Sequence, residues 1–192
     1  MLEHLLNKTV ILASKSPRRQ ELLKGLDIDF EIKTKEVDES YPDRLSPFQV
    51  PVYLAEKKAD AFMDGLTKDS ILITSDTIVV LNGEILEKPK TLEQGKEMIR
   101  LLSGNEHTVV TGVCVRSQEK SISFSDETKV LFTTFSEDEI DYYINKYKPF
   151  DKAGSYGVQE WIGYVGIEKL EGSYYNVMGL PVHKLYAVLK DF

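Results

Sequence analysis

Residues Ile71 to Leu81 form a run that is almost wholly apolar or β-branched, and Asn82-Gly83 follows it directly. A shorter stretch with the same character, 84–86, comes next. Asn-Gly between two such runs is the strongest local indication of a β-hairpin, because both residues tolerate the positive φ angles that a two-residue turn needs. The sequence therefore predicts a long buried strand that ends in a tight hairpin.

An earlier apolar stretch, Thr9–Ala13, predicts a buried strand that leads almost directly into a helix. Ser16 suits the N-cap of this helix, Pro17 suits its first position, and Gly25 suits the residue just past its end. The chain is therefore expected to pass from a strand through a short polar turn into a helix N-terminus.

The other predicted elements alternate without the strict order of βαβ repeats. Capping-box patterns at Thr91 and Ser136 open two helices. The remaining elements are a helix that begins near Ser46 or Pro51 and ends near Met63, strands at 107–115 and 121–135, short strands after Pro149, and a final helix at 181–190. We therefore expect a mixed α/β sheet rather than a barrel. Because no repeat or linker interrupts the chain, residues 1–192 are expected to form one domain.

Charge and hydropathy exclude several classes of protein. The 192 residues carry 24 Lys and Arg against 31 Asp and Glu, a formal net charge of −7, which argues against a general nucleic-acid coat. The longest apolar strings fall well short of the roughly 20 residues that a membrane helix needs. The first residues lack the pattern of a secretory signal, and the single cysteine, Cys114, lies in an apolar stretch that suits a protein core. We expect a cytoplasmic protein that binds neither nucleic acid polymers nor membranes.

Arg18 and Arg19 lie in the first turn of the predicted helix at residue 17. Free N–H groups and the positive end of the helix dipole favour anions there, so two cations are poorly placed unless an anion binds. With Ser14 and Ser16 as further donors, the turn suits a phosphate. Two solvated arginines on a surface turn are an equally acceptable interpretation of the local sequence.

Asp76 interrupts the long apolar run and is the best single catalytic candidate. A carboxylate in a buried strand is costly unless a cation or a metal faces it. Alternatively, Asp76 turns toward solvent on an exposed face of the hairpin.

Lys88 follows the hairpin and lies near Asp76 in the predicted register, which pairs Thr77 with Lys88 and Asp76 with Pro89. Strict alternation places Asp76 and Lys88 on opposite faces. Their convergence would therefore require the ladder to end at Pro89 or a bulge to redirect one side chain.

Two further segments carry weaker indications. Asp38-Glu39 offers oxygen ligands of the kind that Mg²⁺ accepts alongside phosphates, or is simply an acidic surface turn. Residues 151–159 combine an acid-base pair, two glycines and Gln159, whose amide can pair with a base edge. The three histidines lack the spacing of zinc ligands, and neither dinucleotide-binding nor P-loop glycine motifs occur.

Several blocks of the sequence, in order, resemble the Maf family of nucleoside triphosphate pyrophosphatases. Together they cover nearly the whole chain, which makes the resemblance more specific than one short motif. The blocks are Ile11–Leu23, Ser75–Val80, Glu87–Pro89, Leu102–Gly104 with His107–Gly112, Asp151–Gly154 and Glu171–Pro181.

This resemblance implies a Maf/ITPase-like fold, in which a mixed twisted sheet flanked by helices forms two lobes around a central cleft. It implies hydrolysis of a nucleoside triphosphate between the α and β phosphates with a divalent metal cation, Mg²⁺ or Mn²⁺, by a homodimer. Arg18, Thr77 and Gln159 resemble the branch that acts on dTTP and UTP rather than the branch that acts on 7-methyl-GTP. Because the family is also linked to restraint of septum formation, a nucleotide-binding regulator is the alternative from another class.

The resemblance also implies roles for individual residues. Asp76 becomes the proton acceptor or a metal ligand, Lys88 a catalytic phosphate contact, and Glu39 a metal-associated carboxylate. Substrate contacts are implied for Ser14, Arg18, Arg19, Lys58, Thr77, Lys152 and Gln159. Three positions depart from the glycine that is usual in the family: Lys15, Glu87 and Glu160.

Overall fold

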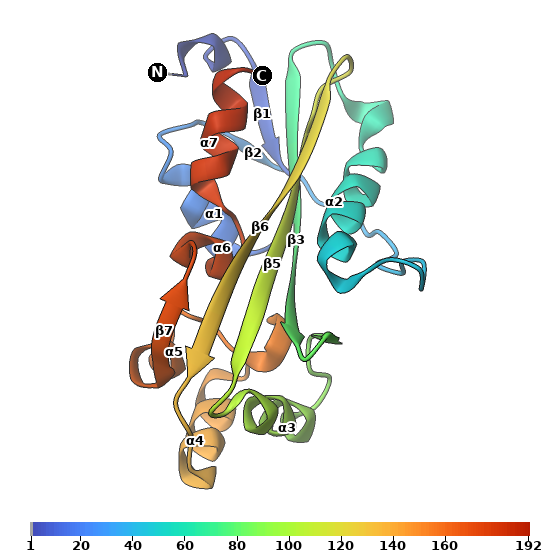
Figure 1. Cartoon of the computed structure of the whole chain (residues 1–192). Helices are drawn as coiled ribbons and strands as arrows, with labels where there is room; N and C mark the ends of the chain where they lie inside the picture. The colour runs from blue at the N-terminus through green and yellow to red at the C-terminus, as the bar shows by residue number, and fades with distance from the viewer. Residues whose placement is uncertain (1) are drawn as a thin grey trace. The chain divides into compact units, whose positions relative to one another are not determined.

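The computed structural model describes residues 2–192 and contains one mixed seven-stranded sheet, with strand order β2-β1-β3-β5-β6-β7 and β4 paired to β3 (Figure 1). β1 is parallel to β2 and β3, whereas β4 is antiparallel to β3 and β7 to β6. The strands are β1 (Thr9–Leu12), β2 (Glu31–Ile32), β3 (Ser70–Leu81), β4 (Glu84–Leu86), β5 (Glu106–Arg116), β6 (Ser121–Phe132) and β7 (Ile167–Glu171). The predicted mixed α/β class is confirmed.

Helices are interspersed with these strands along the chain. They are α1 (Pro17–Lys24), α2 (Val50–Asp60), α3 (Leu92–Leu102), α4 (Glu137–Tyr147), α5 (Trp161–Gly166), α6 (Tyr174–Met178) and α7 (Val182–Lys190). A 3₁₀ turn, Pro47–Gln49, precedes α2, so the structure contains both of the predicted starts for this helix in succession.

The chain divides into two compact units, and the boundary falls inside β3, between Asp76 and Thr77. Unit 1 comprises the residues up to Asp76, together with Thr111–Asp126 and Gly179–Phe192. Unit 2 comprises Thr77–Val110 and Glu127–Met178. The prediction of a single domain stays a prediction.

The core of unit 1 lies between α2 and the sheet. Ala55 and Ala59 of α2 pack with Ile11, Leu72 and Cys114, all of them buried. The predicted core position of Cys114 is thus confirmed. The start of α2 passes so close to β5 that a Cβ on Gly112 would lie 2.2 Å from the carbonyl carbon of Pro51, which requires glycine at that position.

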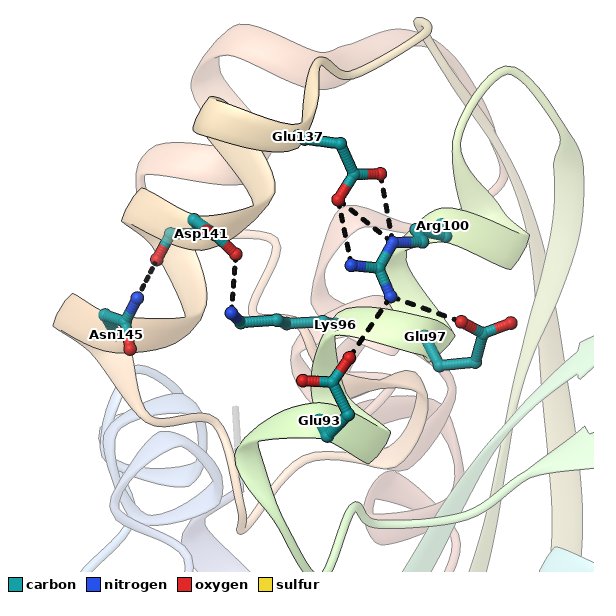
Figure 2. Close-up of polar contacts among 7 residues, drawn as sticks. All are labelled: Glu93, Lys96, Glu97, Arg100, Glu137, Asp141 and Asn145. Carbon is teal, nitrogen blue, oxygen red and sulfur yellow. Dashed lines mark hydrogen bonds and ion pairs between the residues drawn. The ribbon is translucent and has the colours of Figure 1, made fainter.

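Helices α3 and α4 of unit 2 pack against each other. A Cβ on Gly95 of α3 would lie only 3.2 Å from Cδ1 of Ile144 in α4, so the two helices meet closely. Figure 2 shows that exposed ion pairs also join them, from Arg100 to Glu137 at 2.8 Å and from Lys96 to Asp141 at 2.7 Å. Exposed pairs contribute little to stability, so the buried contacts hold the helices together.

The hairpin at Asn82-Gly83 forms as predicted. Its two turn residues have φ angles of 53° and 86°, and Leu81 pairs with Glu84 across the turn. The predicted register is confirmed as far as Val79–Leu86, where the ladder ends. Lys88 therefore follows the ladder rather than pairing within it.

Two local predictions differ from the structure. Gly25 directly follows the last residue of α1, as predicted, but it has an ordinary helical φ of −65°, because the chain continues in tight turns and becomes left-handed only at Asp27, with φ 55°. The segment after Pro149 is mainly helical and contributes one strand, β7, instead of several. There a Cβ on Gly163 would lie 1.9 Å from the Val158 carbonyl oxygen, a tight packing that alternation of side chains does not reveal.

His107 in β5 makes the stability of the fold dependent on pH. Burial lowers the pKa of His107 from 6.5 to about 4, and the Asn105 backbone acts weakly in the opposite direction. Below pH 6.5 the unfolded chain binds a proton that the folded protein binds only near pH 4. The free energy of unfolding therefore falls as the pH falls, by about 2–3 kcal/mol from this group at pH 4.5.

We expect His107→Gln to remove this part of the pH dependence. Urea unfolding of the wild type and the variant at pH 7 and pH 4.5 measures it. The wild type should lose more stability between the two pH values than the variant does. Equal losses in the two proteins would show that His107 is not the responsible group.

Candidate functional site

Asp76 lies in the middle of β3 and is 7% exposed, so it is buried rather than turned toward solvent. Lys58 of α2 donates a hydrogen bond from Nζ to Asp76 Oδ1 at 2.6 Å. Lys58 lies one helical turn from Leu54, a core residue of α2, so the packing of the helix carries its ammonium toward the strand. The buried carboxylate therefore has the cationic partner that its burial requires.

Glu39 contacts the same ammonium. Its Oε1 lies 2.7 Å from Lys58 Nζ, although the Glu39 side chain is 48% exposed. Two carboxylates from distant segments thus converge on one positive charge. The adjacent Asp38 has separate partners: hydrogen bonds from Ser40 and then Lys57 lower the pKa of Asp38 to about 2.

Arg19 is anchored by backbone carbonyl groups close to Asp76. It donates from Nε to Gly179 O at 2.8 Å and from Nη1 to Ser75 O at 3.0 Å. Burial lowers the pKa of Arg19, while the negative charge of Asp76 raises it and the neighbouring Arg18 lowers it. Arginine remains charged in proteins despite such a shift, so Arg19 brings a fixed positive charge to the carboxyl end of β1 and the middle of β3.

The turn before α1 supplies small polar groups. Ser14 is buried, and its Oγ accepts a hydrogen bond from the Ser16 backbone N–H at 3.2 Å. Ser16 is the N-cap residue of α1, as predicted, but its side chain makes no capping bond. The hydroxyl groups of Ser16 and Ser75 are buried and have no hydrogen-bond partner within residues 2–192. Polar groups left in this state suit a ligand that would supply the missing partner.

The ten residues of the predicted site fall into two sets. Unit 1 contains Ser14, Arg18, Arg19, Glu39, Lys58 and Asp76, and unit 2 contains Thr77, Lys88, Lys152 and Gln159. The six residues of the first set include three cations and two carboxylates, which leaves one net positive charge. This set provides the chemistry for holding a strongly anionic group.

Within unit 2, Lys88 follows the hairpin, and the segment that holds Lys152 is tied to it. The Gly154 N–H donates to the carbonyl oxygen of Glu87 at 3.2 Å. A Cβ on Gly154 would lie 2.9 Å from Cγ2 of Val79 in β3, so the segment packs directly on the strand. Lys88 also lines a cavity of about 350 Å³ with apolar residues of β4 and α3.

Lys152 is 9% exposed and lies 2.8 Å from Asp151 Oδ1 and 3.1 Å from Glu160 Oε1. Gln159 Oε1 is buried and has no hydrogen-bond partner in the described chain. The sequence predicted both Lys152 and Gln159 but missed the partner Glu160. The only signal for Glu160 was its departure from the usual glycine.

Residues 9–192 match the sequence model of a family described as "Maf-like protein". A protein named "dTTP/UTP pyrophosphatase" from Parabacteroides distasonis is 50% identical over 100% of both chains. One of the same name from Porphyromonas gingivalis is 53% identical over 100% of this chain and 98% of the relative. Among solved structures, "The structure of the Staphylococcus aureus Ham1 protein" has a TM-score of 0.55 and 19% identity, and covers 96% of this chain and 99% of that one. At this identity the likeness shows the fold alone.

Proposed function

Because this chain belongs to the Maf family, we propose that it hydrolyses dTTP and UTP to the nucleoside monophosphate and pyrophosphate. Relatives that carry this activity in their names are 50–53% identical over essentially the full length of both chains. The observation that carries the proposal is the convergence of Asp76 and Glu39 on Lys58, at 2.6 and 2.7 Å. Two carboxylates in contact with one ammonium group supply the positioning and the charge compensation that hydrolysis of a phosphate anhydride needs.

We also propose that Glu39 and Asp76 hold a divalent cation, Mg²⁺ or Mn²⁺. The two carboxylates already meet on one positive charge, and Mg²⁺ is commonly bound by one or two carboxylates with substrate phosphates and waters. Residues 2–192 contain no cluster of three or more His, Cys, Asp or Glu that could form a complete protein cage. When bound, the cation would neutralise phosphate charge.

In the proposed reaction, a water molecule attacks phosphorus while the anhydride bond between the α and β phosphates breaks. Asp76 orients the water and accepts its proton, and the bridging oxygen leaves with pyrophosphate. Arg18, Arg19, Lys58, Lys88 and Lys152 are proposed to bind phosphate oxygens. Ser14 is proposed to donate to phosphate, and Thr77 and Gln159 to contact the nucleoside. These groups lower the barrier by positioning the substrate and compensating its charge rather than by covalent chemistry.

A substrate panel tests the proposed activity. With Mg²⁺ or Mn²⁺, we expect kcat/KM for dTTP and UTP to exceed that for 7-methyl-GTP by at least about tenfold. Pyrophosphate release from dTTP, UTP, CTP and 7-methyl-GTP measures this ratio. Preference for 7-methyl-GTP would assign the chain to the other branch. No turnover of any triphosphate, together with tight nucleotide binding, would instead favour a regulator of septum formation.

We further propose that the enzyme is a cytoplasmic homodimer that binds no nucleic acid polymer. Its formal charge of −7 supports the last point. No helix within residues 2–192 is long and apolar enough to cross a membrane. Light scattering distinguishes a dimer from the 21.9 kDa single chain.

A further inference from the structure

The carboxylate of Glu160 binds a different partner with each of its oxygens. Oε1 lies 3.1 Å from Nζ of Lys152, and Oε2 accepts a hydrogen bond from the hydroxyl of Tyr143. The same hydroxyl accepts a hydrogen bond from the backbone N–H of Gly157 at 3.0 Å. The side chains of Glu160 and Lys152 are only 17% and 10% exposed. A tyrosine, a glutamate and a lysine thus form one largely buried chain of polar contacts.

The surrounding backbone holds this chain of contacts in place. Tyr143 belongs to α4 and is fully buried, so packing restrains the position of its hydroxyl group. A Cβ on Gly157 would lie 2.8 Å from the carboxyl carbon of Glu160 and 3.0 Å from Cε of Lys152. The ends of the two charged side chains therefore pack directly against the Gly157 backbone, and a side chain at this position would displace them.

The second acid near the lysine cannot give the same restraint. Asp151 lies 2.8 Å from Lys152 Nζ, but its side chain is 58% exposed, and an exposed pair is weak and screened by salt. Burial raises the pKa of Tyr143, and the nearby Glu160 raises it further. Tyr143 therefore keeps its hydroxyl proton and donates it in a hydrogen bond to Glu160.

We propose that Glu160 is a positioning residue that orients the ammonium group of Lys152 before a nucleoside triphosphate binds. This inference rests on the proposed function, in which Lys152 contacts phosphate. A lysine side chain has many rotamers, and binding must otherwise restrict them. Fixing the ammonium in advance removes that cost. The effect is therefore expected in the affinity for the triphosphate.

A double-mutant cycle in dTTP hydrolysis tests the proposal, using Glu160→Gln, Lys152→Met and the double variant. Gln matches Glu in shape but holds an ammonium more weakly. We expect Glu160→Gln to raise KM about tenfold with kcat within about twofold. In the Lys152→Met background, the same change should alter KM by less than about twofold. Glu168→Gln, an exposed acid of β7 in the same unit, is the control with no expected effect.

Three results would overturn the inference while leaving the proposed function intact. The first two are an unchanged KM in Glu160→Gln and an unchanged KM in Lys152→Met. The third is a KM of the double variant that equals the product of the two single effects, which would show that Glu160 acts independently of Lys152. If the wild type hydrolyses no triphosphate, the proposed function fails. In that case calorimetry measures the Kd for dTTP of the same variants and decides whether Glu160 acts through Lys152. Additive changes in binding free energy would reject this role.

Discussion

Asp76→Asn is expected to lower kcat for dTTP about 10²–10⁴-fold, the usual contribution of a positioned general base. The amide has the shape of the carboxylate but accepts no proton. Its fold should persist, because Lys58 keeps its contact with Glu39 at 2.7 Å. Pyrophosphate release measures turnover, and dTTP calorimetry shows whether nucleotide binding survives. Retention of kcat within about twofold would remove Asp76 from its proposed role.

The chain offers a close match for this variant in Asp126 of β6. Asp126 lies 2.6 Å from Lys184, and Asp76 lies 2.6 Å from Lys58; both acid side chains are 10% exposed. Asp126→Asn therefore removes an equally buried carboxylate from a lysine outside the predicted site, although Lys184 is 42% exposed and Lys58 only 17%. We expect the two variants to lose similar stability but only Asp76→Asn to lose turnover. Equal loss of turnover in both would indicate general damage to the fold.

Lys58→Met is expected to lower the free energy of unfolding by about 2–4 kcal/mol, because Glu39 and Asp76 lose their shared ammonium and repel each other. This value is at the low end for a buried pair, since Glu39 is half-exposed and screened by solvent. If the two acids bind a divalent cation, Mn²⁺ should stabilise the variant more than the wild type. A cation at about 100 times its Kd restores about 2.7 kcal/mol.

Chemical denaturation with and without Mn²⁺, in the absence of nucleotide, measures this effect independently of turnover. Lys184→Met is the control. It removes the lysine partner of Asp126, which does not belong to the proposed metal pair. We expect Mn²⁺ to stabilise Lys58→Met and not Lys184→Met. The same response in both variants would contradict metal binding by Glu39 and Asp76.

The local features of the fold were predictable because short-range sterics control them. Asn82-Gly83 adopts the left-handed angles that its residue types favour, and the register of the hairpin follows from the length of its turn. The start of α1 follows from the fixed φ of Pro17 at its first position, and the start of α4 follows from the capping box at Ser136. The failure after Pro149 concerns the helix at Trp161, where a Cβ on Gly163 would lie 1.9 Å from the Val158 carbonyl oxygen, a close local approach that no hydrophobic period signals.

The candidate site was predicted mainly as a set of residues rather than as an arrangement. The resemblance to the family implied roles for Asp76, Glu39 and Lys58, but the residues alone left open whether Asp76 faces solvent. The structure buries it and gives it Lys58 as a partner. Glu160 was recognisable only as a departure from glycine, and its contacts with Lys152 and Tyr143 had no signal in the sequence.

The sequence by itself determined the long strand and its hairpin, the strand that leads into α1, the mixed α/β class and the family. Each of these depends on residue type, spacing or motif order along the chain. Tertiary structure alone decided that Lys58 joins Asp76 to Glu39 and that Glu160 holds Lys152. The physical reason is that an ion pair forms when packing brings charges within a few ångströms, and packing depends on side chains throughout the core rather than on the neighbours of the charged residue.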